Sequence, residues 1–369
     1  MVSFTIFLIF VLCGIASFTN QKGQCALSIA SVILLSLVMG LSYDSADYGN
    51  YLHRYYNGLD ATVHPLLSDP GYLFFNNIFN IIGFTFEEYR YFLTLLLIIF
   101  IFGTWYKIYG ETYTLFPLYI IYPMIFDIIQ YRNFIIEIII FCGFYIYARK
   151  DNNLHGFMLC VIFACLFHKA AIFFLLIYCI DKMMKSRCGR KALLLFMLIG
   201  VLMPLYAERV MDMSMDVYLG LANVENIGHY KDYLMDDFKT RHYTSWAVTI
   251  IYLIIIYRIR KVIMKKRIVD KFYARYSEMM YDTIILMCIL LPIFPLLQDL
   301  DRLLRILTLP LYTIMIWYVK ERNILINKII GWCCVLVFAM MVGYIKLYHG
   351  LPEVVPVIFE KNYWYDLFL

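Results

Sequence analysis

The sequence predicts an all-α membrane protein: a polytopic transmembrane helix bundle that forms a single integral membrane domain over residues 1–369. Three observations predict this class. Hydrophobic residues make up 63% of the chain, charged residues make up 16%, and the mean hydropathy is +0.72. Most apolar segments are apolar on every face, as expected for helices surrounded by lipid. They are also continuous, which excludes the alternating pattern of a membrane barrel strand.

We expect about 12 membrane segments, including a short re-entrant-like hairpin. Their predicted ranges are 2–19, 25–41, 91–106, 112–129, 133–148, 155–167, 170–181, 192–206, 244–257, 282–297, 303–319 and 329–346. Lys and Arg gather in the loops 182–191 and 258–275 and at Arg149, which the positive-inside rule places in the cytoplasm. The stretch 155–181 must then enter the membrane from the cytoplasmic side and return to that side. Its two short helices therefore form the predicted hairpin, with a tip near His168.

Two long segments, 42–90 and 207–243, are predicted as external loops. The stretch 72–86 is half apolar, and we expect an interfacial helix there. The apolar start of the chain lacks a basic region and a cleavage site, so it is interpreted as a retained first span. The ten cysteines mostly lie in apolar runs without metal-ligand or redox spacing, and nucleotide-binding motifs are absent. We therefore expect no cofactor, no metal and no nucleic-acid partner.

Arg132 is the first candidate for a functional site, because it lies at the predicted outer start of a span. A guanidinium group fits phosphate oxygens in a bidentate way, which suggests that it holds a lipid-linked diphosphate. The alternative is a structural arginine that reaches the interface or pairs with Asp127 or Glu137. Arg302 and Arg305 share one helical face and could form a second phosphate or glycan contact. Their alternative is a local network with Asp299 and Asp301.

His168 is the preferred general base, and its neighbour Lys169 would favour the neutral imidazole by like-charge repulsion. The alternative is a histidine that only bonds neighbouring helices. Competing bases are Asp44 and Asp47, for which the alternatives are binding of sugar hydroxyls and a position in a solvated loop. Further candidates for substrate binding share the same external segment: Tyr48 and Tyr51, on a helical stripe with Tyr55 that could stack on sugar rings, and Asp69.

Four short blocks, in this order, resemble the EpsG family of Wzy-like polysaccharide polymerases. They are Asp47-Tyr48-Gly49-Asn50-Tyr51, Asp69-Pro70-Gly71-Tyr72, Tyr131-Arg132-Asn133-Phe134 and His168-Lys169-Ala170-Ala171. Arg302 and Arg305 before Pro310 resemble a late arginine block of the family. The chain departs from the family pattern at Asp44, which lacks an arginine shortly before it, and at Asn133, Glu137 and Ala170.

The resemblance implies a glycosyltransferase that joins undecaprenyl-diphosphate-linked oligosaccharides into exopolysaccharide or O-antigen, as in lipopolysaccharide biosynthesis. It would be a multi-pass protein of the bacterial cytoplasmic membrane acting at the outer face, with membrane lipid and a chain-length regulator protein as further partners. Arg132 would then hold the leaving diphosphate, with Arg302 or Arg305 as a second contact and His168 or Asp47 as the base. Two alternatives remain: a flippase for lipid-linked oligosaccharides, and an O-acyltransferase with a central histidine.

Overall fold

The computed structural model describes residues 2–43, 45, 47–58, 69–149, 153–202, 227–265, 270–291, 301–321, 325–347 and 362–363, and the described residues are almost all helical. They form two compact units. Unit 1 comprises 1–146, 155–171 and 315–369, and unit 2 comprises 147–154 and 172–314. Each unit is described by itself.

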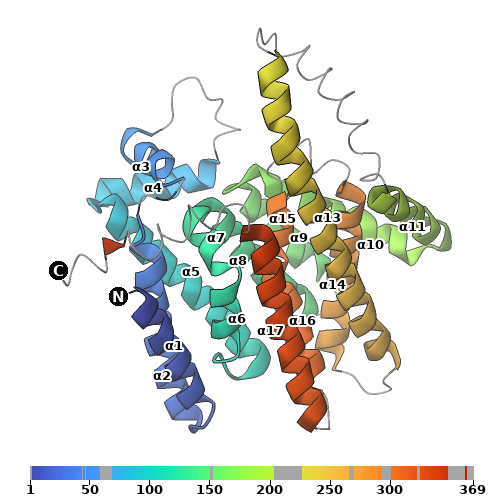
Figure 1. The fold of residues 1–369 in the computed structure, drawn as a ribbon, viewed down its shortest axis with the longest axis horizontal. Coiled ribbons are helices and arrows are strands. Elements are labelled where there is room, and N and C mark those ends of the chain that lie inside the picture. The colour runs from blue at the N-terminus through green and yellow to red at the C-terminus, as the bar shows by residue number, and fades with distance from the viewer. Residues whose placement is uncertain are drawn as a thin grey trace. The chain divides into compact units, whose positions relative to one another are not determined.

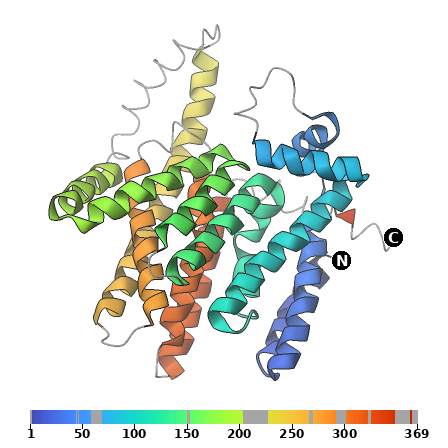
Figure 2. The same ribbon diagram turned by 180° about the vertical axis from the view of Figure 1, so that it is seen from behind.

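Unit 1 contains helices that follow the predicted apolar segments (Figure 1). They are α1 (Val2–Ala16), α2 (Gln21–Gly40), α3 (Tyr48–Asn57), α4 (Pro70–Ile82), α5 (Phe86–Tyr109), α6 (Leu115–Ile121), α7 (Met124–Ile129), α8 (Tyr131–Arg149, which ends in unit 2), α9 (Leu154–Cys165) and α17 (Leu325–Leu347). Helix α2 packs between α1 and α5, and α17 packs on α6. Figure 2 shows α3 and α4 together at one end of this unit.

Unit 2 contains most of a 3₁₀ helix (Lys169–Leu176), α10 (Ile177–Lys185), α11 (Arg187–Leu202), α13 (Ile227–Lys265), α14 (Lys271–Leu290), α15 (Asp301–Ile306) and the first part of α16 (Thr308–Lys320). Helix α14 packs against α10, α11 and α13. Gly200 of α11 allows a close approach, because a Cβ atom there would lie 2.0 Å from the Cys288 carbonyl oxygen.

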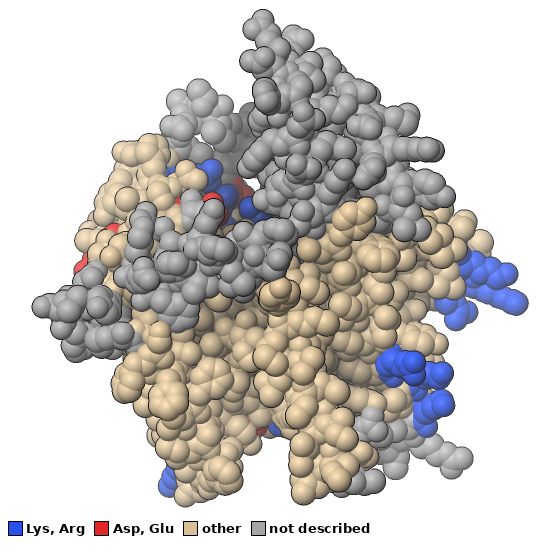
Figure 3. Space-filling model, viewed as in Figure 1, with Lys and Arg blue, Asp and Glu red and all other residues tan. Residues whose placement is uncertain are grey.

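Five of the described helical segments are long and apolar enough to cross a membrane. They are Gln21–Gly40, Phe86–Tyr109, Tyr131–Arg149, Arg302–Lys320 and Leu325–Ile345, and the shorter apolar helices are Val2–Ala16 and Leu154–Cys165. The helical class is therefore confirmed, but the predicted count of about 12 spans is not. Large apolar side chains are exposed on several helices, including Phe4 (65%), Phe100 (58%) and Val337 (56%). Uncharged residues likewise dominate the described surface in Figure 3, as expected for contact with lipid.

The predicted elements differ from the observed ones in several places, and the predicted loop 258–275 holds the end of α13 and the start of α14. The segment 112–129 is two helices, because Pro123 follows a residue with extended backbone: Tyr122 has φ −167° and ψ 127°. The stretch 42–90 holds α3, α4 and the start of α5, while the predicted loop 207–243 holds the start of α13 at Ile227. The stretch 203–226 of that loop lies outside the described residues.

A capping box begins α5, the longest apolar helix of unit 1. The Thr85 hydroxyl accepts a hydrogen bond from the Glu88 amide at 3.3 Å, and the Glu88 carboxylate accepts one from the Thr85 amide at 2.8 Å. The helix then runs for 24 residues, about 36 Å at 1.5 Å per residue. Features near Phe86 and features after Tyr109 therefore lie at opposite ends of the unit.

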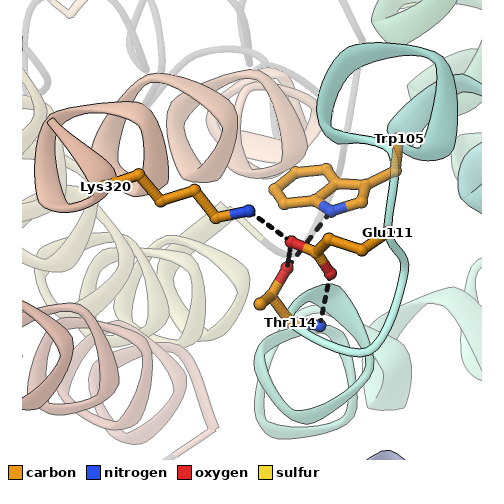
Figure 4. A network of polar contacts seen from close by, with 4 residues as sticks. All are labelled: Trp105, Glu111, Thr114 and Lys320. Atoms are coloured by element: carbon orange, nitrogen blue, oxygen red, sulfur yellow. Dashed lines mark hydrogen bonds and ion pairs between the residues drawn. The ribbon is translucent and has the colours of Figure 1, made fainter. Parts of the chain in front are cut away.

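Glu111 lies beyond the C-terminal end of α5, in the polar network of Figure 4. Its carboxylate accepts hydrogen bonds from Lys320 Nζ at 2.6 Å, from the Thr114 hydroxyl at 2.6 Å and from the Thr114 amide at 3.2 Å. Trp105 Nε1 in turn donates to Thr114 Oγ1 at 3.4 Å. The last residue of α16 is thus tied to the connection between α5 and α6, 209 residues away in sequence.

We expect Lys320→Ala to destabilise the protein by about 3 kcal/mol, because it leaves the buried Glu111 carboxylate without its cation. The figure is at the low end of the range for buried pairs, since the Lys320 side chain is 36% exposed. Thermal unfolding in detergent of Glu111→Ala, Lys320→Ala and the double variant measures the coupling between the two side chains. Additive effects of the two substitutions would contradict this role.

Candidate active site

Arg132 and Asp69 form an ion pair in unit 1, between Nη1 and Oδ2. Arg132 is the second residue of α8, and Asp69 immediately precedes α4. The Asp69 side chain is 5% exposed and the Arg132 side chain is 20% exposed. The pair joins two of the blocks that carry the family resemblance, and it differs from the alternative in which Arg132 pairs with Asp127 or Glu137. Asp127 instead accepts a hydrogen bond from the Tyr119 hydroxyl at 2.8 Å.

The backbone of Asp69 is left-handed, with φ 55° and ψ 68°, and Asp69 is the one described non-glycine residue with positive φ. Such a conformation costs on the order of 1–3 kcal/mol and persists where the surroundings enforce it. Asp69 occupies the N-cap position of α4 but makes no capping hydrogen bond. Its carboxylate is directed to Arg132 rather than to its own helix.

The Arg132 guanidinium lies against an aromatic ring as well. Its Cζ atom is 5.7 Å from the ring centroid of Tyr51 on α3, and that ring is in edge contact with Tyr72 of α4 at 5.8 Å. Its Nε is buried and has no hydrogen-bond partner among the described residues. Arg132 is therefore oriented by a carboxylate and a ring while keeping hydrogen-bonding capacity.

The His168 block meets the same end of α4. The Gly71 amide donates to the Leu166 carbonyl oxygen at 2.7 Å, and the rings of Phe75 and Phe167 lie 5.7 Å apart. A Cβ atom at Gly71 would lie 2.9 Å from Leu166 Cβ and 3.0 Å from its carbonyl oxygen, so glycine permits this contact. The turn after α9 therefore packs beside the residues that precede and begin α4.

His168 itself is buried, with 3% of its surface exposed. Its Nδ1 atom accepts a hydrogen bond from the Ala170 amide at 3.1 Å. A nitrogen that accepts from an N–H group carries no proton, so the proton of the neutral imidazole is on Nε2. In this geometry Nε2 is the donor nitrogen of the neutral imidazole, and the predicted role of His168 as a base stays a prediction.

Arg90 is a further buried cation that the sequence analysis missed, because it fell just before the predicted span 91–106. It is 3% exposed, and its Nη1 donates to the Ser42 carbonyl oxygen. Its Cζ atom lies 5.1 Å from the ring centroid of Tyr48 and 5.8 Å from that of Tyr131. The available signal was the same as for Arg132: an arginine that directly follows a tyrosine near the start of an apolar helix.

The other predicted site residues take different positions. Asp47 is half-buried before α3 and makes no capping hydrogen bond, and the Tyr48 hydroxyl donates to Glu87 at 2.8 Å. Tyr51 is 5% exposed, so its ring faces protein. Lys169 is exposed. Asp44 lies outside the described residues.

Arg302 and Arg305 lie on α15 in unit 2, where Arg302 is half-buried and Arg305 is buried. Asp299 lies outside the described residues, and so does the Asp301 side chain. A common site of the two arginines with Arg132 stays a prediction.

The C-terminal residues Asn362 and Tyr363 contact the junction between α2 and α3. Asn362 Nδ2 donates to the Val38 carbonyl oxygen at 2.8 Å, and the Tyr363 amide donates to the Leu41 carbonyl oxygen at 3.0 Å. The Tyr363 ring lies 4.5 Å from that of Tyr43. A segment more than 300 residues away thus stabilises the start of the block that carries Asp47.

The fold and these contacts define a multi-pass helical membrane protein with a partly buried arginine–carboxylate pair beside a histidine turn. The chain belongs to the EpsG family, whose model matches residues 25–359. The family predicted from the four sequence blocks is therefore confirmed. Comparison with curated proteins and with solved structures gave no match.

Proposed function

We propose that this protein is a polysaccharide polymerase, a glycosyltransferase that joins undecaprenyl-diphosphate-linked oligosaccharides at the outer face of the bacterial cytoplasmic membrane. The product would be an exopolysaccharide or an O-antigen. Family membership supports this class of function. The observation that carries the proposal is the ion pair of Arg132 with Asp69, which lies beside the turn that holds His168.

The reaction needs no nucleotide. The bond between the anomeric carbon of the growing chain and the diphosphate oxygen breaks, and a hydroxyl oxygen of the incoming unit bonds to that carbon. The hydroxyl proton passes to a base, and undecaprenyl diphosphate leaves with the electron pair of the broken bond. Negative charge therefore grows on phosphate oxygens in the transition state, where fixed donors are most effective.

Arg132 is proposed to bind the leaving diphosphate. Its guanidinium is oriented by Asp69 and Tyr51, and this preorganisation lowers the cost of aligning it during the reaction. Asp69 is a positioning residue in this proposal. Arg302, Arg305 and Lys169 are proposed as further contacts with the anionic or polar substrate.

His168 is proposed to donate a hydrogen bond from Nε2 to the diphosphate, since Nδ1 is held by the Ala170 amide. The base is then assigned to Asp47, one helical turn before Tyr51 in α3. A carboxylate that makes no capping hydrogen bond retains lone pairs for an acceptor hydroxyl. Tyr48 and Asp44 belong to the same segment and are proposed to border the acceptor sugar.

The direct experiment uses the purified protein in liposomes with lipid-diphosphate-linked repeat units. A ladder of products on a gel, formed without nucleotide, would support the polymerase. Transport of the units across the bilayer without any change in their length would contradict it.

A further inference from the structure

Four polar atoms next to the Arg132 site are buried and have no hydrogen-bond partner among the described residues. They are Tyr72 Oη, Asn76 Nδ2, Asn76 Oδ1 and Tyr89 Oη. The three residues are 1%, 0% and 0% exposed, respectively. We call Tyr72, Asn76 and Tyr89 the buried polar cluster.

The cluster lies between α4 and α5. Tyr72 and Asn76 are four residues apart in α4 and share one face of that helix. Tyr89 lies on α5, which packs against α4. Tyr72 is in edge contact with Tyr51, whose ring lies against the Arg132 guanidinium. Tyr72 therefore connects the cluster to the proposed diphosphate contact.

Neighbouring polar groups on α4 and on the adjacent α3 are paired. Asn80 Nδ2, one turn beyond Asn76, donates to the Tyr55 carbonyl oxygen at 3.1 Å, and the Tyr55 hydroxyl donates to the Phe84 carbonyl oxygen at 2.8 Å. The contrast matters because a buried polar group without a partner costs free energy on folding. Several such groups in one cluster indicate that a partner other than this chain satisfies them.

The chemistry of the cluster indicates what that partner is. A primary carboxamide with both its N–H donors and its oxygen unpaired complements a secondary amide, which offers one acceptor and one donor. The two phenols can donate to and accept from hydroxyl groups. Burial raises the pKa of Tyr72, so its hydroxyl stays protonated.

We propose that the buried polar cluster binds the sugar directly attached to the diphosphate, with Asn76 recognising an acetamido substituent on that sugar. The proposal rests on the proposed function, because it uses Arg132 as the contact for the diphosphate. Specificity for the sugar would then come from α4, while affinity for the lipid diphosphate would come from Arg132.

Ligand access requires α4 to move away from α5, since Asn76 is fully buried. The outward side of α4 is exposed, as shown by Phe74 at 61% and Ile81 at 85%. A single helix layer therefore covers the cluster on that side.

The test is binding of three probes to the purified full-length protein: farnesyl diphosphate, farnesyl-diphosphate-linked N-acetylglucosamine and farnesyl-diphosphate-linked glucose. We expect the wild type to bind the acetamido probe at least about tenfold more tightly than the glucose probe, as for a site built to hydrogen-bond its ligand. In Asn76→Leu the two sugar probes should bind equally, and farnesyl diphosphate should bind as to the wild type. The melting temperature should stay equal or rise, because a similar-sized apolar side chain replaces unpaired groups.

Asn80→Leu is the matched control on the same helix. It should lower the melting temperature and leave the ratio between the two sugar probes unchanged, since it removes a paired group. Equal binding of the two sugar probes to the wild type would overturn the inference while leaving the polymerase proposal intact, and so would a lower melting temperature with an unchanged ratio in Asn76→Leu. Failure of all three probes to bind would instead contradict the proposed function, and the inference with it.

Discussion

Arg132→Ala is expected to reduce the rate of polymerisation about 10²–10³-fold, the usual effect of removing one preorganised donor from a developing anion. Arg132→Lys should fail nearly as badly. An ammonium group lacks the planar fork that binds two phosphate oxygens, and it cannot lie against Tyr51 while pairing with Asp69 in the same geometry. The loss should appear mainly in kcat, because the contact strengthens in the transition state.

Initial rates of product laddering in liposomes measure this effect. Arg54→Ala is the matched control, since Arg54 lies on α3 of the same unit and is half-buried. It should leave the rate close to that of the wild type. Polymer of normal length from Arg132→Ala would end the assignment of Arg132.

His168→Ala is expected to reduce the rate to a similar extent, whereas His168→Gln should lose only about tenfold. The glutamine amide can place an N–H donor near the position of Nε2, but it cannot act as a base. A base role would therefore make both variants equally inactive. The comparison separates donation from proton abstraction at one position.

The pH profile gives an independent check of the same assignment. A base must be deprotonated, so a histidine base would produce an activity loss on the acidic side that disappears in His168→Gln. We expect the activity loss at acidic pH to persist in His168→Gln, and Asp47→Asn to be nearly inactive at every pH. If the activity loss at acidic pH disappears in His168→Gln, the base is His168 and the assignment of Asp47 is wrong.

Sequence patterns predicted several helices well, for a clear physical reason. The segments 25–41, 133–148 and 329–346 correspond to α2, α8 and α17 because continuous apolar runs have no stable place outside lipid or a core. The prediction was wrong at 112–129, where hydropathy is continuous but Pro123 interrupts the backbone. It also left α3 and the start of α13 inside the predicted loops 42–90 and 207–243, since polar amphipathic helices carry little hydropathy signal, whereas the helix expected at 72–86 is observed as α4.

Candidate residues were easier to find than their contacts. An arginine or histidine inside an apolar run is conspicuous, so Arg132 and His168 could be selected from the sequence alone. The residues that contact them could not be identified in this way. Asp69 is 63 residues from Arg132, and the alternatives considered from the sequence were its near neighbours Asp127 and Glu137. Arg90 was overlooked because a shift of one residue in a predicted boundary placed it in a loop.

The amino-acid sequence by itself determined the helical membrane class, the EpsG family and the short list of ionisable residues, because these follow from local composition and from the order of short motifs. Tertiary structure alone decided that Asp69 pairs with Arg132, that the Ala170 amide donates to His168 Nδ1, and that polar atoms of Tyr72, Asn76 and Tyr89 have no partner among the described residues. The physical reason is that hydrogen bonds and ion pairs depend on distances between atoms that folding brings together, and hydropathy does not encode those distances.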